Sequence, residues 1–180
     1  PTLLSWLEKK RPKVYQRIIE ADRESTKQFG GHGSAMAQVY NHIIMPLANR
    51  RDKETQVIWG IRDFEHHFNR KPEGMWLAET AVDTETLEVL AENGISFTIL
   101  APRQAKAYRK IGAKDWKQGI DTRVPYICQL PSGKSINLFF YDGERSQDGA
   151  FKGLLIDGKE FANRLLSGFD NNSGKPQLVH

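Results

Sequence analysis

Apolar residues recur at helical spacing in four parts of the chain. Residues 3–20 form the first part, and Pro12 interrupts it, which predicts two short helices there. An aspartate precedes each of the other three patterns, at Asp52, Asp83 and Asp157, and is expected to cap a helix. The apolar positions that these three helices are expected to bury are Val57, Ile61, Phe64 and Phe68; Leu87, Leu90 and Ala91; and Phe161, Leu165 and Phe169.

Short continuous apolar runs separate the helices and predict buried strands. They occupy residues 35–48 (with a turn at Pro46), 75–78 and 95–100, followed by a hairpin over 124–142 and the start of a strand at 177–180. This alternation of strand and helix predicts an α/β fold. We expect a mostly parallel sheet with helices outside and one inserted β-hairpin, open or closed into a barrel, in a single domain over residues 1–180.

Composition and charge exclude several classes of protein. With 39% hydrophobic and 27% charged residues the chain is expected to be globular, and without an apolar run of about 18 residues no membrane association is predicted. The net charge is +4, but basic and acidic residues are interspersed, so no nucleic-acid partner is expected. Cys128 is the single cysteine, which excludes an internal disulfide and a cysteine-cluster metal site and favours a cytoplasmic location.

The two ends of the sequence predict a piece of a longer protein. The chain begins at Pro1 inside an amphipathic pattern and stops within PQLVH, where a strand is expected to begin. A sheet that lacks strands has an edge with unpaired N–H and C=O groups. We therefore expect the isolated chain to self-associate through an exposed sheet edge or to be only marginally stable.

Two acids stand where predicted strands end, and ligands collect at the carboxyl ends of parallel strands. Glu79 closes GMWLAE, beside Trp76, which could stack on a sugar, and Gly74, which allows close approach. A carboxylate in the first turn of the next helix is an equally good interpretation of Glu79. Asp142 closes INLFFYD, although a turn aspartate before Gly143 is the simpler interpretation.

The histidines give weaker signals. His42 lies in the apolar run VYNHIIMPL, where a buried core histidine is the commoner case, and His32 in GGHGS lies either at a site or in water. His66 and His67 are predicted on the polar surface of a helix, without an acidic partner at ligand spacing. Dinucleotide, phosphate-loop, GxSxG and HExxH motifs are absent from the sequence. Two acids beside aromatic residues suggest glycoside hydrolysis, which needs a pair of carboxyl groups.

Residues 31–83, together with LFFYDG at 138–143, resemble glycoside hydrolase family 57, and most closely its bacterial branch of unknown function. NHIIMPL is similar to the second family motif, GMWLAE to the third and LFFYDG to the fourth. The resemblance implies a (β/α)7 barrel, a nucleophile at Glu79 and a general acid/base at Asp142. Thr80 departs from the family pattern, in which an arginine commonly follows the nucleophile, and the first and fifth motifs lie outside the chain.

The resulting prediction is a retaining glycosidase or glucanotransferase that acts on α-linked oligo- or polysaccharides without a metal or organic cofactor. Glu79 attacks the anomeric carbon, and Asp142, kept protonated by its apolar neighbours, protonates the leaving oxygen. The two carboxyls are expected on one rim of the sheet, about 5–5.5 Å apart, or roughly 8 Å apart in an incomplete or unliganded site. The residues predicted to bind the sugar are His42, Trp76, Tyr141 and His32.

Two alternatives stay open. A metal-dependent α-mannosidase or polysaccharide deacetylase would need clustered histidine and aspartate ligands, for which the chain offers His32 and His42 near the expected site. A non-catalytic carbohydrate-binding or regulatory protein could keep the barrel without activity, and Thr80 is consistent with that.

Overall fold

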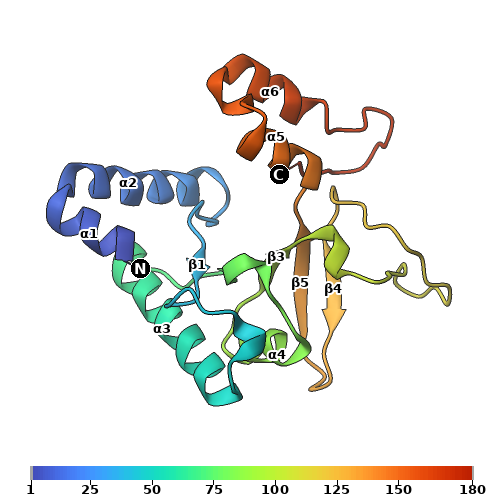
Figure 1. The fold of residues 1–180 in the computed structure, drawn as a ribbon, viewed down its shortest axis with the longest axis horizontal. Coiled ribbons are helices and arrows are strands. Elements are labelled where there is room, and N and C mark those ends of the chain that lie inside the picture. Colours follow the sequence, from blue (N-terminus) through green and yellow to red (C-terminus); the bar gives the residue numbers. More distant parts are fainter. Residues whose placement is uncertain (1, 180) are drawn as a thin grey trace. The chain divides into compact units, whose positions relative to one another are not determined.

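A computed structural model describes residues 2–179 as a mixed α/β structure (Figure 1). Its helices are α1 (Thr2–Lys10), α2 (Pro12–Gln28), α3 (Arg50–Phe68), α4 (Thr84–Glu92), α5 (Gly143–Phe151) and α6 (Gly158–Leu166). Its strands are β1 (Ala37–Gln38), β2 (Met75–Trp76), β3 (Phe97–Leu100), β4 (Tyr126–Gln129) and β5 (Ser135–Phe140). Short 3-10 turns are η1 (Met45–Leu47), η2 (Ala78–Thr80), η3 (Pro102–Gln104) and η4 (Leu154–Ile156). Within residues 2–179, no helix combines the length and apolar character that crossing a bilayer requires.

The chain divides into two compact units. The first contains the residues up to Thr98 together with Gln129–Ile136, and the second contains Ile99–Cys128 together with the residues from Asn137 onward. The predicted single domain over residues 1–180 stays a prediction.

The strands form two short sheets. In the first, β1 pairs with β2 in parallel, with Ala37 opposite Met75 and Gln38 opposite Trp76. The second has the order β3-β5-β4, and β4 and β5 form the predicted hairpin. An isolated parallel β-bridge joins Gly74, just before β2, to Phe97, the first residue of β3. Neither sheet closes on itself among the described residues.

Helix α3 covers β1 and β2 at very close range. Its inner face buries Val57 and Phe64, as the apolar spacing predicts, and Met75 of β2 is fully buried. A methyl group added at Gly60 would lie 2.1 Å from the backbone oxygen of Gln38, so only glycine allows the helix to approach β1 this closely. The predicted strand face and helix face therefore meet in the core of the first unit.

A buried lysine connects α3 to the start of α4. The Lys53 side chain is 2% exposed, and its Nζ donates to Asp83 Oδ2 and Glu85 Oε2, both at 2.8 Å. Burial lowers the pKa of Lys53, but the hydrogen bonds to the two carboxylates outweigh this effect and the net shift is upward. The predicted cap is confirmed, because Asp83 Oδ1 accepts from the backbone N–H of Thr86. The two ion pairs hold the start of α4, and with it the end of the segment that connects β2 to α4, against α3.

Several local predictions are confirmed. The break at Pro12 separates α1 from α2, because proline fits the first turn of a helix but cannot donate to the turn before it. Asp157 caps α6 by accepting from the backbone N–H groups of Lys159 and Glu160.

Other local predictions are wrong. Asn49, not Asp52, caps α3, and the backbone N–H of Asp52 donates to its side chain. The run 35–48 contains only the two-residue β1 before it turns into η1, and residues 177–179 form no strand, while His180 lies outside the described residues. Phe161 is 37% exposed, and Phe169, which is 39% exposed, lies beyond the end of α6, so the predicted inner face of this helix is only partly covered.

The prediction that His66 and His67 both lie on the surface is also wrong. His66 is exposed, but His67 is buried against Tyr15 of α2, whose hydroxyl lies 3.0 Å from His67 Nδ1. Burial, the largest effect, lowers the pKa of His67.

Candidate active site

Glu79 occupies a strained turn directly after β2. Both Glu79 and Thr80 have left-handed backbones, with φ of 55° and 52°, which costs non-glycine residues on the order of 1–3 kcal/mol each. The N–H groups of Thr80 and Ala81 donate to Leu77 and Ala78, both at 3.0 Å, and close the turn. Helix α4 begins only at Thr84, so the interpretation of Glu79 as a first-turn residue of that helix is wrong.

The turn places the Glu79 carboxylate in solvent between two buried neighbours. Ala78 and Thr80 are buried, whereas the Glu79 side chain is 73% exposed. Strained backbone of this kind persists only where the surrounding structure fixes it, and it is frequent at functional sites. The turn therefore presents the carboxylate at the carboxyl end of β2.

His42 contacts the Glu79 carboxylate. Its Nε2 lies 3.2 Å from Glu79 Oε1, and its side chain is 70% exposed, so the interpretation of His42 as a core residue is wrong. His42 follows β1 and Glu79 follows β2, and the two strands are parallel. The structure thus brings two of the predicted site residues together at the carboxyl ends of adjacent strands, where such a site is expected.

Gln56 of α3 positions the segment that carries His42. Its side-chain oxygen accepts from the backbone N–H of Asn41 at 2.6 Å, and its backbone oxygen accepts from Tyr40 at 3.2 Å. Tyr40 also packs edge-on against Trp59 of α3, with ring centroids 5.4 Å apart. The sequence analysis missed Gln56, although a polar residue next to the buried Val57 of an amphipathic helix was a signal for it.

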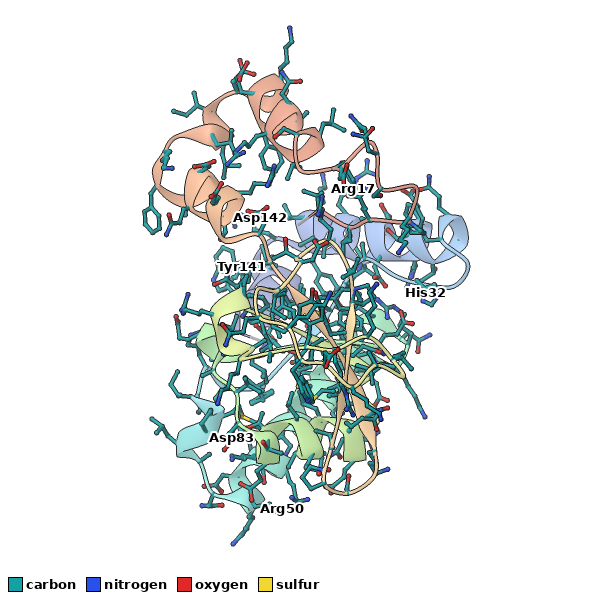
Figure 2. The ribbon with its side chains drawn as sticks, turned by 90° about the vertical axis from the view of Figure 1, so that its right-hand side faces the viewer. Arg17, His32, Arg50, Asp83, Tyr141 and Asp142 are labelled. Atoms are coloured by element: carbon teal, nitrogen blue, oxygen red, sulfur yellow. The ribbon has the colours of Figure 1, made fainter. Side chains whose placement is uncertain are left out.

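His32 lies at the other end of the same strand pair. It stands in the loop after α2, labelled in Figure 2, and its Nδ1 lies 2.7 Å from Oε1 of Glu73, which precedes β2. Because His32 and Glu73 precede the strands that His42 and Glu79 follow, the structure does not bring His32 together with Glu79. The metal-dependent alternative relied on His32 and His42 sharing one site, and that pairing is absent from the described residues.

Trp76 is partly accessible in β2, whereas Gly74 is buried. Trp76 is half-buried in β2, and its backbone oxygen accepts from Val39 at 3.3 Å. Gly74 is buried against Phe97, where an added methyl group would lie 2.3 Å from the ring. The glycine therefore allows close packing between β2 and β3, and close approach of a sugar at this position stays a prediction.

Asp142 caps helix α5 instead of standing in a simple turn. Its Oδ1 accepts from the backbone N–H groups of Glu144 and Arg145, at 3.1 and 3.0 Å, and its Oδ2 forms an ion pair with the Arg145 guanidinium. Figure 2 shows Asp142 next to Tyr141 where β5 meets α5. The backbone N–H of Tyr141 donates to Leu100 at 3.1 Å, which fixes the end of β5.

These contacts shift the pKa of Asp142. Burial raises the pKa of its carboxyl, but the hydrogen bonds and the positive charge from Arg145 outweigh burial, and the net shift is downward. The expectation that apolar neighbours keep Asp142 protonated is therefore wrong. An arginine three residues after a helix-capping aspartate was visible in the sequence, and the sequence analysis missed it.

Glu79 belongs to the first compact unit and Asp142 to the second. Their predicted convergence on one sugar stays a prediction.

Comparison with known proteins identifies the family of the chain. A model of glycosyl hydrolase family 57 matches residues 2–179. Among curated proteins, Alpha-amylase 1 from Dictyoglomus thermophilum is 28% identical over 99 residues, which are 54% of this chain and 13% of the amylase.

Solved structures with similar folds include a 4-alpha-glucanotransferase from Thermococcus litoralis (TM-score 0.65, 19% identity) and an exo-type maltose-forming amylase from Pyrococcus sp. ST04 (TM-score 0.70, 22% identity). Each match covers 99% of this chain, but only 25% and 28% of the respective enzyme. A branching enzyme from Thermococcus kodakaraensis, in complex with glucose, matches 76% of this chain and 28% of its own, with a TM-score of 0.55 and 22% identity.

These likenesses show a mixed α/β fold that corresponds to part of the family's catalytic (β/α)7 barrel. With the family model matched from residue 2 to residue 179, the chain belongs to glycosyl hydrolase family 57.

Proposed function

We propose that the full-length protein is a retaining hydrolase or glycosyltransferring enzyme that acts on α-linked glucans, with Glu79 as its nucleophile. The observation that carries the proposal is the exposed Glu79 carboxylate at the carboxyl end of β2, held in a left-handed turn and 3.2 Å from His42. The relatives named as an amylase, a glucanotransferase and a branching enzyme support the substrate class.

In the first step, a carboxylate oxygen of Glu79 forms a bond to the anomeric carbon while the bond to the leaving oxygen breaks. Asp142 gives its proton to the leaving oxygen, so the first product departs as a neutral alcohol. His42 orients the Glu79 carboxylate or donates to a hydroxyl of the bound sugar. The product of this step is a glycosyl ester on Glu79.

In the second step, Asp142 takes a proton from water or from an acceptor sugar, whose oxygen then displaces Glu79 from the anomeric carbon. Two displacements at one carbon restore its configuration. Water as the acceptor gives hydrolysis, and a sugar hydroxyl gives transfer.

Asp142 must be protonated for the first step, although Arg145 lowers its pKa. In the proposed site the negative charge of Glu79 opposes Arg145, because a neighbouring like charge disfavours a second carboxylate. Glycosylation neutralises Glu79 and removes this opposition. Asp142 can then lose its proton and act as the base, as the second step requires.

The direct test is to incubate the full-length protein with a maltooligosaccharide and to follow the anomeric protons of the products by NMR. The proposal predicts that α-anomers appear first and that mutarotation to the β-form follows. Initial β-anomers would overturn the retaining mechanism.

A carbohydrate-binding protein without activity is the second candidate. The ion pair between Arg145 and Asp142 favours it, since a carboxyl held in the charged form is a poor proton donor. Such a protein would retain a maltooligosaccharide on an affinity column and release it unchanged. Product formation under the same conditions would exclude this candidate.

A further inference from the structure

One cluster of metal-ligating side chains lies outside the candidate active site. Glu8 of α1 and His66 and His67 of α3 each offer one ligand atom, and these atoms all lie within 4.8 Å of one another. Figure 1 shows α1 beside the C-terminal end of α3, the end that contains residues 66 and 67. Glu8 comes from a distant part of the sequence, so the spacing within α3 did not reveal it. Asp63 lies four residues before His67 in the same helix, so the prediction that the histidines lack an acidic partner at ligand spacing is wrong.

His67 provides the strongest indication of a missing ligand. Its side chain is only 1% exposed, and its Nε2 has no hydrogen-bond partner among the described residues. Leaving a buried polar atom unsatisfied costs about 1–3 kcal/mol, so such an atom calls for a specific explanation. Its other nitrogen, Nδ1, is already in contact with the hydroxyl of Tyr15, at 3.0 Å.

The surroundings of Nε2 fit a cation. Asp63 Oδ1 lies 3.7 Å from it, too far for a hydrogen bond. Two ligand atoms that share one tetrahedral Zn²⁺ are about 3.3 Å apart, given metal–ligand bonds of about 2.0–2.2 Å. Asp63 therefore stands close to the distance expected of a further oxygen ligand or of a group that contacts a metal-bound water.

We propose that Glu8, His66 and His67 bind a divalent transition-metal ion, for which Zn²⁺ is the probe of choice. Two imidazoles and a carboxylate are a frequent zinc donor set. His67 contributes the fixed, buried Nε2. With an ion on Nε2, the ring hydrogen is on Nδ1 and is donated to the Tyr15 hydroxyl 3.0 Å away, the arrangement that supports many metal-bound histidines.

The three ligand atoms would have to move only slightly closer together to bind one ion. Ligand atoms now up to 4.8 Å apart must approach to about 3.3 Å. His66 is exposed and Glu8 is half-buried, so both side chains have room to change rotamer while His67 stays in place.

The ion would fasten α1 to α3 and would have a structural role. Gln56, which positions the active-site segment, lies ten residues before His66 on α3, or about 15 Å along the helix axis. The proposed site is thus separate from His42 and Glu79, and its loss should not remove the nucleophile.

The test is calorimetric titration of the metal-free full-length protein with Zn²⁺, repeated for His66→Gln and Glu8→Gln. Each substitution should weaken the site at least about tenfold, because it deletes a direct ligand. The matched control is His32→Gln, which deletes an exposed histidine that also contacts a carboxylate, and it should leave this affinity unchanged. Co²⁺ in place of Zn²⁺ should give visible absorption typical of tetrahedral coordination, and both His66→Gln and Glu8→Gln should reduce it.

Zn²⁺ should also raise the melting temperature of the native protein, since an ion that binds only the folded state stabilises it. This rise should be smaller in both ligand variants. Absence of saturable Zn²⁺ binding, or binding that His66→Gln and Glu8→Gln leave unchanged, would overturn the proposal. Circular dichroism of the two variants, whose replaced side chains are not fully buried, verifies that each is folded.

Discussion

Replacing Glu79 by glutamine separates a catalytic role from a structural one. The substitution keeps the size of the side chain but removes the charge that attacks the anomeric carbon. In the structure, the Glu79 carboxylate lies 3.2 Å from His42 Nε2, and both side chains are more than two-thirds exposed. An exposed polar contact of this kind contributes about 0–1 kcal/mol to stability.

The two expected effects differ widely in magnitude. The free energy of unfolding should fall by no more than about 1 kcal/mol, which lowers the melting temperature by only a few degrees, roughly 2–4 °C for a domain of this size. Turnover should fall by about 10⁴-fold or more, equivalent to about 5 kcal/mol of transition-state stabilisation, because no covalent intermediate can form.

The assay measures release of an aryl group from an α-glucoside and hydrolysis of a maltooligosaccharide, next to a thermal melt of the same preparation. Glu73→Gln is the matched control, since Glu73 also contacts a histidine, His32, but at the opposite end of the strand pair. It should retain near-normal turnover. Near-normal turnover of Glu79→Gln, or an equal loss in both variants, would refute the assignment of Glu79 as nucleophile.

Three further predictions address the other parts of the account. Asp142→Asn should slow maltooligosaccharides far more than aryl glucosides whose leaving group needs no proton; equal losses would argue against an acid role. Arg145→Gln removes the group that lowers the pKa of Asp142, so this pKa should rise and the alkaline limb of the kcat/KM profile should move to higher pH. An unshifted limb would mean that another group supplies the proton. Gly60→Ala should lower the free energy of unfolding in urea by about 1–3 kcal/mol, because the added methyl would lie 2.1 Å from the backbone oxygen of Gln38; wild-type stability would show that α3 does not pack this closely on β1.

The sequence was sufficient where structure depends on neighbours along the chain. Asp83 and Asp157 cap the helices that they precede, since a side-chain oxygen reaches N–H groups two or three residues away. Pro12 separates two helices for an equally local reason. The position of Glu79 at the end of a strand also followed from a short pattern, because an apolar run that stops at a charge marks the end of burial.

The sequence was insufficient where distant segments decide the structure. Met45 is fully buried although it lies in a turn, so the apolar run around it indicated burial but not a strand. His67 is buried by Tyr15, which stands 52 positions earlier. The left-handed backbones of Glu79 and Thr80 have no local signature either, since non-glycine residues adopt them only under constraint from the surrounding fold.

The pKa of Asp142 depends on both neighbours along the chain and the folded geometry. Of the two opposing influences on its pKa, the sequence analysis used burial by apolar neighbours and missed the Arg145 guanidinium. Only the geometry decides between them, because a carboxylate that accepts two backbone N–H groups and an arginine fork is stabilised in its charged form.

The central claim is that Glu79 forms a covalent bond to the sugar, and trapping that bond tests it most directly. The full-length protein is incubated with a fluorinated α-glucosyl fluoride, whose good leaving group permits the first step while the ring fluorine slows the second. Digestion and mass spectrometry then locate the sugar. The account predicts a fluoroglucosyl ester on Glu79 in the native protein and none in Glu79→Gln. A stable ester on a different carboxylate would contradict it.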